Sequence, residues 1–139
     1  HTSDFWVFEG VDGRDYAVTG TWGADGTSFF WDVTDPTSIK KIDSVKVDAR
    51  TVNDVKVSQD GRISVISREG ASDRKNGIII LDVSNPYDVK VLSEYTKNLT
   101  GGVHNVFIDN DHVYALSGSQ RYYIINIKDP KKSSRGWNV

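Results

Sequence analysis

Five polar residues of this 139-residue chain could together form a functional site: Asp4, Asn53, Asp54, His104 and Asn105. They recur near the starts of three predicted strands. Alignment of these strands places Asp4, Asn53 and His104 at matching positions, and Asp54 and Asn105 in the next position along. A histidine and carboxylates that converge on one axis can bind a metal ion or a polar ligand. They can equally satisfy backbone groups at the strand ends, or line a water-filled channel.

The rest of the chain carries no recognisable catalytic or cofactor motif. Closely spaced zinc or calcium ligands are absent, as are a glycine-rich phosphate loop and a nucleophile elbow. The chain contains no cysteine, so neither disulfides nor thiolate chemistry can operate. The sequence therefore predicts no catalytic residue, no metal-ligand set and no cofactor.

The elements that must position the five residues are organised around a stretch that occurs three times, at residues 29–36, 78–86 and 122–130. Each copy is an apolar run followed by Asp or Asn, an apolar residue, a linker residue, Asp or Asn, and proline. The run is β-branched or aromatic and does not alternate, which indicates a strand buried on both faces. The acidic or amide side chain can bond nearby backbone N–H groups, and proline ends the ladder.

The copies recur about every 45 residues, the spacing of a four-stranded β-propeller blade. Strand patterns predict blades at about 4–48, 52–96 and 103–139, the third incomplete, in a single partial propeller domain. The tail after Pro130 either starts a further strand or is irregular, and Trp137 within it either packs or contacts a partner. The predicted fold class is all-β, with about three antiparallel blades of a larger ring of six or seven.

Composition limits the classes of partner. A formal net charge of −2 gives no basic field for nucleic acid, and no apolar run is long enough for direct membrane insertion. The chain also contains no methionine, so we expect it to be a processed product or a piece of something longer. Three blades cannot close a ring, and we expect the remaining blades of the same chain, or a second copy, to complete it.

The stretch at residues 78–86 resembles the LVIVD repeat, a bacterial β-propeller repeat named for an apolar run followed by Asp. The first copy matches with aromatic residues in place of aliphatic ones, whereas the third has Asn126 for the Asp and Lys128 for the usual Ser or Thr. The resemblance covers residues 4–130. It implies an extracytoplasmic location (secreted, periplasmic or cell surface) and brings no catalytic motif with it.

Two functions follow as hypotheses. The first is a non-catalytic propeller that serves as a binding or scaffolding module with a protein partner, in a secreted or cell-envelope protein or assembly. The second is a metal-assisted hydrolase or lactonase with its site at the channel mouth, around His104, Asn105, Asn53 and Asp54. Fold-level likeness alone cannot decide between them.

Overall fold

The structure is a computed structural model that describes residues 1–139 except 24, 119–120, 133 and 139, with only the backbone of residues 134–138. The described residues form strands and turns without helices. Accordingly, none of them belongs to a helix that could cross a membrane. The fold is therefore all-β, as the sequence predicts.

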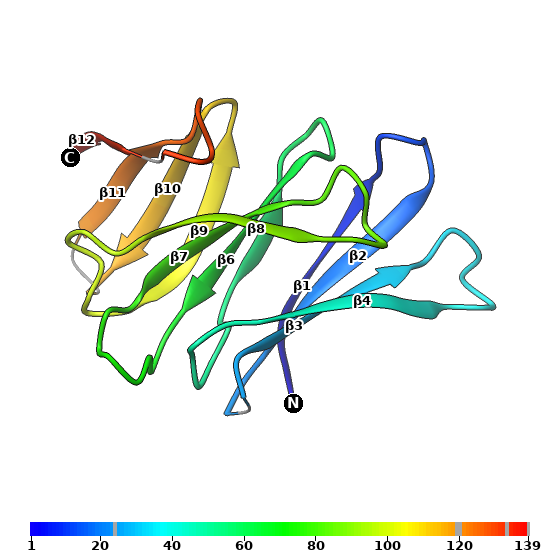
Figure 1. Ribbon diagram of the computed structural model, residues 1–139, viewed down its shortest axis with the longest axis horizontal. Helices are drawn as coiled ribbons and strands as arrows, with labels where there is room; N and C mark the ends of the chain where they lie inside the picture. Colours follow the sequence, from blue (N-terminus) through cyan, green and yellow to red (C-terminus); the bar gives the residue numbers. More distant parts are fainter. Residues whose placement is uncertain (24, 119–120, 133, 139) are drawn as a thin grey trace.

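The described strands form three antiparallel sheets of four strands each (Figure 1). The first contains β1 (Thr2–Glu9), β2 (Asp15–Thr21), β3 (Thr27–Asp32) and β4 (Lys40–Lys46). The second contains β5 (Val55–Val57), β6 (Ile63–Arg68), β7 (Gly77–Asp82) and β8 (Lys90–Tyr95). The third contains β9 (Val103–Asp109), β10 (His112–Ser117), β11 (Arg121–Asn126) and β12 (Ser134–Asn138). Strands pair in chain order within each sheet, and we call the sheets blades 1, 2 and 3.

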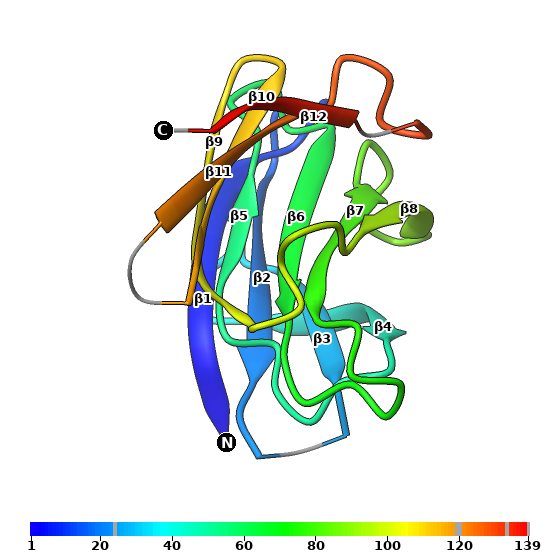
Figure 2. The same cartoon turned by 90° about the vertical axis from the view of Figure 1, so that its left-hand side faces the viewer.

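The tail that the sequence left open forms β12, which pairs with β11, so blade 3 also has four strands. The side chain of Trp137 lies outside the described residues. The blades stack face to face, and their first strands β1, β5 and β9 lie side by side at one edge (Figure 2). Strands β4 and β8 lie at the opposite edge. This arrangement is that of a β-propeller segment, whose channel edge carries β1, β5 and β9.

The repeated element forms the third strand of each blade and ends in two successive side-chain turns. In the first turn, the side chain that closes the strand accepts a hydrogen bond from the backbone N–H two residues on. The backbone N–H of Thr34 donates to the Asp32 side chain at 3.1 Å, that of Ser84 to Asp82 at 2.9 Å, and that of Lys128 to Asn126 at 2.9 Å. The second turn has the same kind of hydrogen bond. The backbone N–H groups of Thr37, Tyr87 and Lys131 donate to the side chains of Asp35, Asn85 and Asp129, respectively. Asn126 keeps the turn because its amide oxygen is as good an acceptor as a carboxylate.

Two apolar cores hold the blades together. The core between blades 1 and 2 includes Phe8, Tyr16, Val18 and Phe30 against Val55, Ile66, Ile79 and Leu81. The core between blades 2 and 3 includes Val65, Ile78, Ile80 and Tyr95 against Val106, Val113, Ala115 and Ile125. Successive residues of β7 therefore enter opposite cores, which explains why its sequence is continuously apolar. We call the side of a blade that packs on the following blade its front face, and the opposite side its back face.

Replacement of Ile80 by Asp tests the assignment of β7 as a strand covered on both sides. Ile80 is fully buried, so the carboxylate would have no partner and the free energy of unfolding should fall by about 3 kcal/mol or more. Val91→Asp is the matched control, because Val91 is exposed on β8. Urea denaturation of the two variants measures the difference, and equal stabilities would contradict the assignment.

Candidate functional site

The channel edge carries one polar contact that recurs from blade to blade. Asp4 lies in β1 directly before Phe5, where the continuous pairing with β2 begins. Its carboxylate accepts a hydrogen bond from the backbone N–H of Val55 at 3.2 Å. The Asp54 carboxylate accepts the same bond from the backbone N–H of Val106 at 2.5 Å. Each bond links a blade to the first strand of the next blade. Two of the five predicted site residues therefore tie the blades together.

The pairing of the strands corrects the sequence alignment by one residue. Phe5, Val55 and Val106 occupy equivalent positions, because each pairs with the equivalent residue of the second strand of its blade. The residues that precede them, Asp4, Asp54 and Asn105, are thus equivalent. The alignment of Asp4 with Asn53 and His104 was wrong. Residue types alone allowed both alignments, because each of them matches Asp4 with polar residues of the other two blades.

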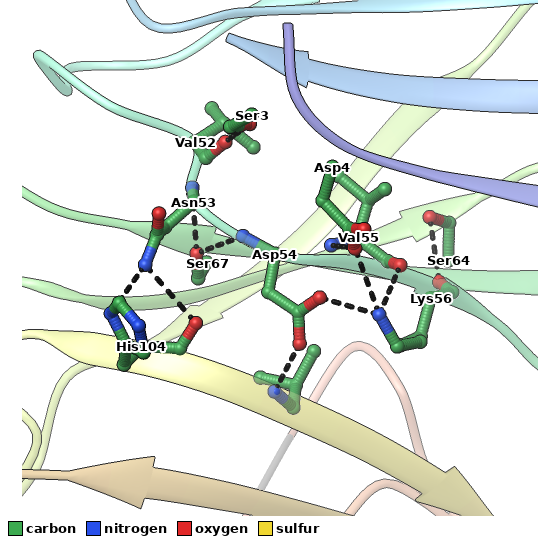
Figure 3. Close-up of polar contacts among 11 residues, drawn as sticks. Ser3, Asp4, Val52, Asn53, Asp54, Val55, Lys56, Ser64, Ser67 and His104 are labelled. Atoms are coloured by element: carbon green, nitrogen blue, oxygen red, sulfur yellow. Dashed lines mark hydrogen bonds and ion pairs between the residues drawn. The ribbon is translucent and has the colours of Figure 1, made fainter. Parts of the chain in front are cut away.

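A lysine that the sequence analysis did not single out joins two of these residues. Lys56 Nζ lies 2.9 Å from the Asp4 carboxylate and also bonds the Asp54 carboxylate (Figure 3). The ammonium group also donates to the Val55 carbonyl at 3.0 Å and lies 5.1 Å from the centre of the Trp6 ring. Lys56 follows Asp54 by two residues in a strand, so alternation puts both side chains on one face. That alternation is the sequence signal that could have identified it.

Burial and the neighbouring polar groups together shift the pKa values of Asp4, Asp54 and Lys56. Burial disfavours the Asp4 carboxylate, but interactions with Asp54, Lys56 and the Val55 N–H outweigh it and lower the pKa of Asp4 to about 2. Burial raises the pKa of Asp54, and its interaction with Asp4 raises it further. Burial also disfavours charged Lys56, yet the two carboxylates raise its pKa above the usual value. The cluster is an ion-pair network in which one ammonium serves two carboxylates.

Asn53 and His104 form a second tie between blades 2 and 3. Asn53 Nδ2 lies 2.7 Å from Nδ1 of His104 and 3.2 Å from its carbonyl oxygen. Because an amide nitrogen only donates, Nδ1 of His104 is the acceptor and the neutral ring carries its proton on Nε2. The ring nitrogen that could accept a proton is therefore already engaged by Asn53. The backbone of Asn53 is fixed as well, since its N–H donates to Ser67 Oγ at 3.0 Å.

The structure thus brings together Asp4, Asp54 and Lys56, and separately Asn53 and His104. Asn105 joins neither group. It lies exposed on β9, and its side chain makes no hydrogen bond within the described part of the chain. No described set of three or more His, Cys, Asp or Glu side chains could hold a metal ion. The arrangement supplies connections between blades rather than a nucleophile, a paired acid and base, or a ligand cage.

A groove lies elsewhere, between blades 2 and 3. It has a volume of about 550 Å³ and is lined by the β5–β6 turn (58–60), the β9–β10 turn (109–111) and the end of the repeated element (128 and 130), with Ile63, Ile108 and Ile127. None of the five predicted site residues lines it. Sequence reasoning missed this groove because turns from different blades form it.

Comparison with known proteins identifies the fold and not a family. No family model matches the chain, and no curated protein matches it. Among solved structures, a protein of Bacteroides fragilis NCTC 9343 described as a putative 6-phosphogluconolactonase superposes with a TM-score of 0.72 at 16% identity. A second, from Bacteroides uniformis ATCC 8492 and described in the same words, superposes with a TM-score of 0.74 at 15% identity.

The two superpositions cover 99% and 96% of this chain but only 37% and 39% of those proteins. The chain therefore spans well under half the length of the solved structures that it matches. At such low identity the likeness shows the β-propeller type of fold alone, because one fold hosts many functions.

Replacement of Asp54 tests the tie between blades 2 and 3. Asp54→Ala leaves the Val106 N–H buried without an acceptor and Lys56 with one carboxylate, so we expect a loss of about 2–3 kcal/mol in unfolding free energy. Asp54→Asn keeps the acceptor and should cost about 1 kcal/mol. Asp111→Ala, at an exposed turn, is the control. Urea denaturation provides the values, and equal losses for the Ala and Asn variants would count against the tie.

The low pKa of Asp4 predicts a particular sensitivity to acid. Its native pKa of about 2 lies below the ordinary value of 3.8, so its contribution to stability is complete above pH 4 and is lost as the pH falls towards 2. The raised pKa of Asp54 has the opposite effect on stability. The stability that protonated Asp54 contributes is lost as the pH rises through the pKa of Asp54 in the folded chain. Urea denaturation at pH 4, 3 and 2 should therefore show a shallower decline for Asp4→Asn than for the parent. Parallel declines would contradict the assignment.

Proposed function

We propose that this chain is a non-catalytic, LVIVD-like β-propeller module that provides a rigid platform for binding or scaffolding. The observation that carries the proposal is the engagement of the polar residues at the channel edge. Asp4, Asp54 and Lys56 bond one another and the next blade, and Asn53 bonds His104. Groups committed to contacts between blades are not poised to attack or activate a substrate.

The setting that we propose is a secreted or cell-envelope protein or assembly, with a protein as partner. The absence of cysteine is compatible with an oxidising compartment, and the resemblance of the repeated element to the LVIVD repeat supports an extracytoplasmic location. Turns at both ends of the stacked blades offer exposed loops on a fixed scaffold, where proteins commonly place their binding residues.

Lactone hydrolysis at the channel mouth is the competing proposal. It is supported by the superposition of nearly the whole chain on two proteins described as putative 6-phosphogluconolactonases. It is also supported by the exposed position of His104 at the channel edge. The orientation of the ring opposes it, because a general base needs a nitrogen that is free to accept a proton, and Asn53 already occupies Nδ1.

An assay of hydrolysis decides between the two proposals. The 139-residue chain is incubated with 6-phosphogluconolactone and with an unphosphorylated δ-lactone, with and without Zn²⁺, Ca²⁺ or Mg²⁺, and bound metal is measured by elemental analysis. We expect turnover at the buffer rate and no stoichiometric metal. His104→Ala should equal the parent, as should the control His112→Ala, whose imidazole lies on β10. Turnover that His104→Ala abolishes and His112→Ala preserves would establish the hydrolase instead.

A further inference from the structure

The groove between blades 2 and 3 lies at a place that aromatic side chains fill between blades 1 and 2. In blade 1, Phe8 and Tyr16 belong to the core of that first junction, with ring centres 5.9 Å apart, and Tyr16 is only 1% exposed. Tyr87 of blade 2 meets the Tyr16 ring edge to face at 6.2 Å. Three aromatic rings therefore fill this end of the first junction.

The equivalent positions of the second junction carry smaller or polar residues. Strand pairing puts Ile63 at the position of Tyr16, and Ser58, which bonds Ile63 across the hairpin, at the position of Phe8. The residue after the proline of the repeated element is a lysine, Lys131, rather than a tyrosine. Ser58 and Ile63 both line the groove. The groove is therefore open because the second junction lacks the three rings of the first.

The floor of the groove is apolar and continues the core between blades 2 and 3. Ile127 belongs to that core, and Ile63 and Ile108 pack against it. The equivalents of Ile108 and Ile127 in the first junction are Val57 and Val83, which are buried in the core that contains the rings. The volume of about 550 Å³ lies in the range of ligand sites. The groove thus offers an aromatic ring the same kind of surface that buries the rings of blade 1.

A carboxylate at the rim is placed to accept a phenol hydroxyl. In the β1–β2 turn, Asp12 accepts the N–H of Arg14 through Oδ1 at 3.2 Å and the Tyr16 hydroxyl through Oδ2 at 2.9 Å. In the shorter β5–β6 turn, Asp60 accepts the N–H of Arg62 through Oδ1, also at 3.2 Å. Its Oδ2 makes no hydrogen bond within the described part of the chain. The acceptor that holds the tyrosine of blade 1 is thus free in blade 2.

The charge of the rim indicates what should lie beside such a ring. Among the residues that line the groove, Asp60, Asp109 and Asp111 supply three carboxylates and Lys128 supplies one ammonium group. The surplus of negative charge favours a partner with basic groups and disfavours a phosphorylated tyrosine.

We propose that the groove takes a tyrosine side chain of a protein partner, with basic residues next to that tyrosine. The ring packs on Ile63, Ile108 and Ile127, and its hydroxyl donates to Asp60 Oδ2. Tyrosine is one of the residues that most often anchor protein interfaces, because it combines a large apolar ring with a polar end. The inference rests on the proposed function as a binding module and names the chemistry of its partner.

Titration of the isotope-labelled 139-residue chain with the acetylated peptide Gly-Lys-Tyr-Lys-Gly, followed by NMR, tests the proposal. Amide signals of residues 58–63 and 108–111 should shift, and those of residues 4–8 should not. A peptide with phenylalanine in place of tyrosine loses a hydrogen bond to a charged acceptor, so its dissociation constant should be about 10-fold higher. One with alanine should not bind. Equal constants for the tyrosine and phenylalanine peptides, shifts elsewhere in the chain, or no binding would overturn the proposal.

Refilling the groove from within provides a second test. Ile63→Tyr places a ring where blade 1 has Tyr16 and should abolish binding of the tyrosine peptide. Val91→Tyr is the matched control, because Val91 is 56% exposed on β8 and does not line the groove, and it should bind as the parent does. Urea denaturation shows that each variant is folded. Binding that survives Ile63→Tyr, or that Val91→Tyr also abolishes, would refute the groove as the site.

Two further outcomes separate this proposal from its alternatives. Para-cresol that binds as tightly as the peptide would make a small phenol, and not a protein, the occupant. Absence of peptide binding refutes the role of the groove alone, whereas the lactone assay decides the proposed function.

Discussion

The structure depends on sheets that are apolar on both faces. A third strand such as β7 sends successive side chains into two different cores, so its sheet is stable only between two neighbours. The middle blade meets this condition within the chain. Blades 1 and 3 each have one neighbour, and their outward faces carry exposed aromatic and aliphatic residues. The stacking of the blades follows from this single requirement.

Apolar faces alone leave the blades free to slide, and the polar contacts at the channel edge remove that freedom. Hydrogen bonds are directional, so a carboxylate that binds one particular N–H fixes the register between two stacked sheets. Asp54 is buried, and such a group is costly unless it is paired. Lys56 and the Val106 N–H supply its partners. Four of the five candidate site residues, Asp4, Asn53, Asp54 and His104, therefore make contacts that connect the blades.

Much of the fold could be predicted from the sequence, because the repeated element combines an apolar run with turn residues whose local hydrogen bonds are the same in every context. Asn126 stands where the other two copies have Asp, and the turn is still as predicted, because its amide oxygen accepts the same hydrogen bond as Asp32 and Asp82. The polar site was harder. Residue types matched Asp4 to the polar residues of the other blades in two ways, and the alignment chosen was one residue out of register. The partner of Asp54 is a backbone N–H 52 residues away, for which no side-chain pattern exists. The role of Lys56 was within reach of strand alternation and was overlooked.

Hydrogen exchange of the Val55 and Val106 amides, followed residue by residue by NMR, tests most directly the claim that carboxylates tie the blades together. Both amides bond the preceding blade rather than a strand of their own sheet, so without the tie they would exchange like unpaired amides at a sheet edge. We expect protection of both amides close to that of the core strands, lost at Val55 in Asp4→Ala and at Val106 in Asp54→Ala. Rapid exchange of both amides in the parent chain would contradict it.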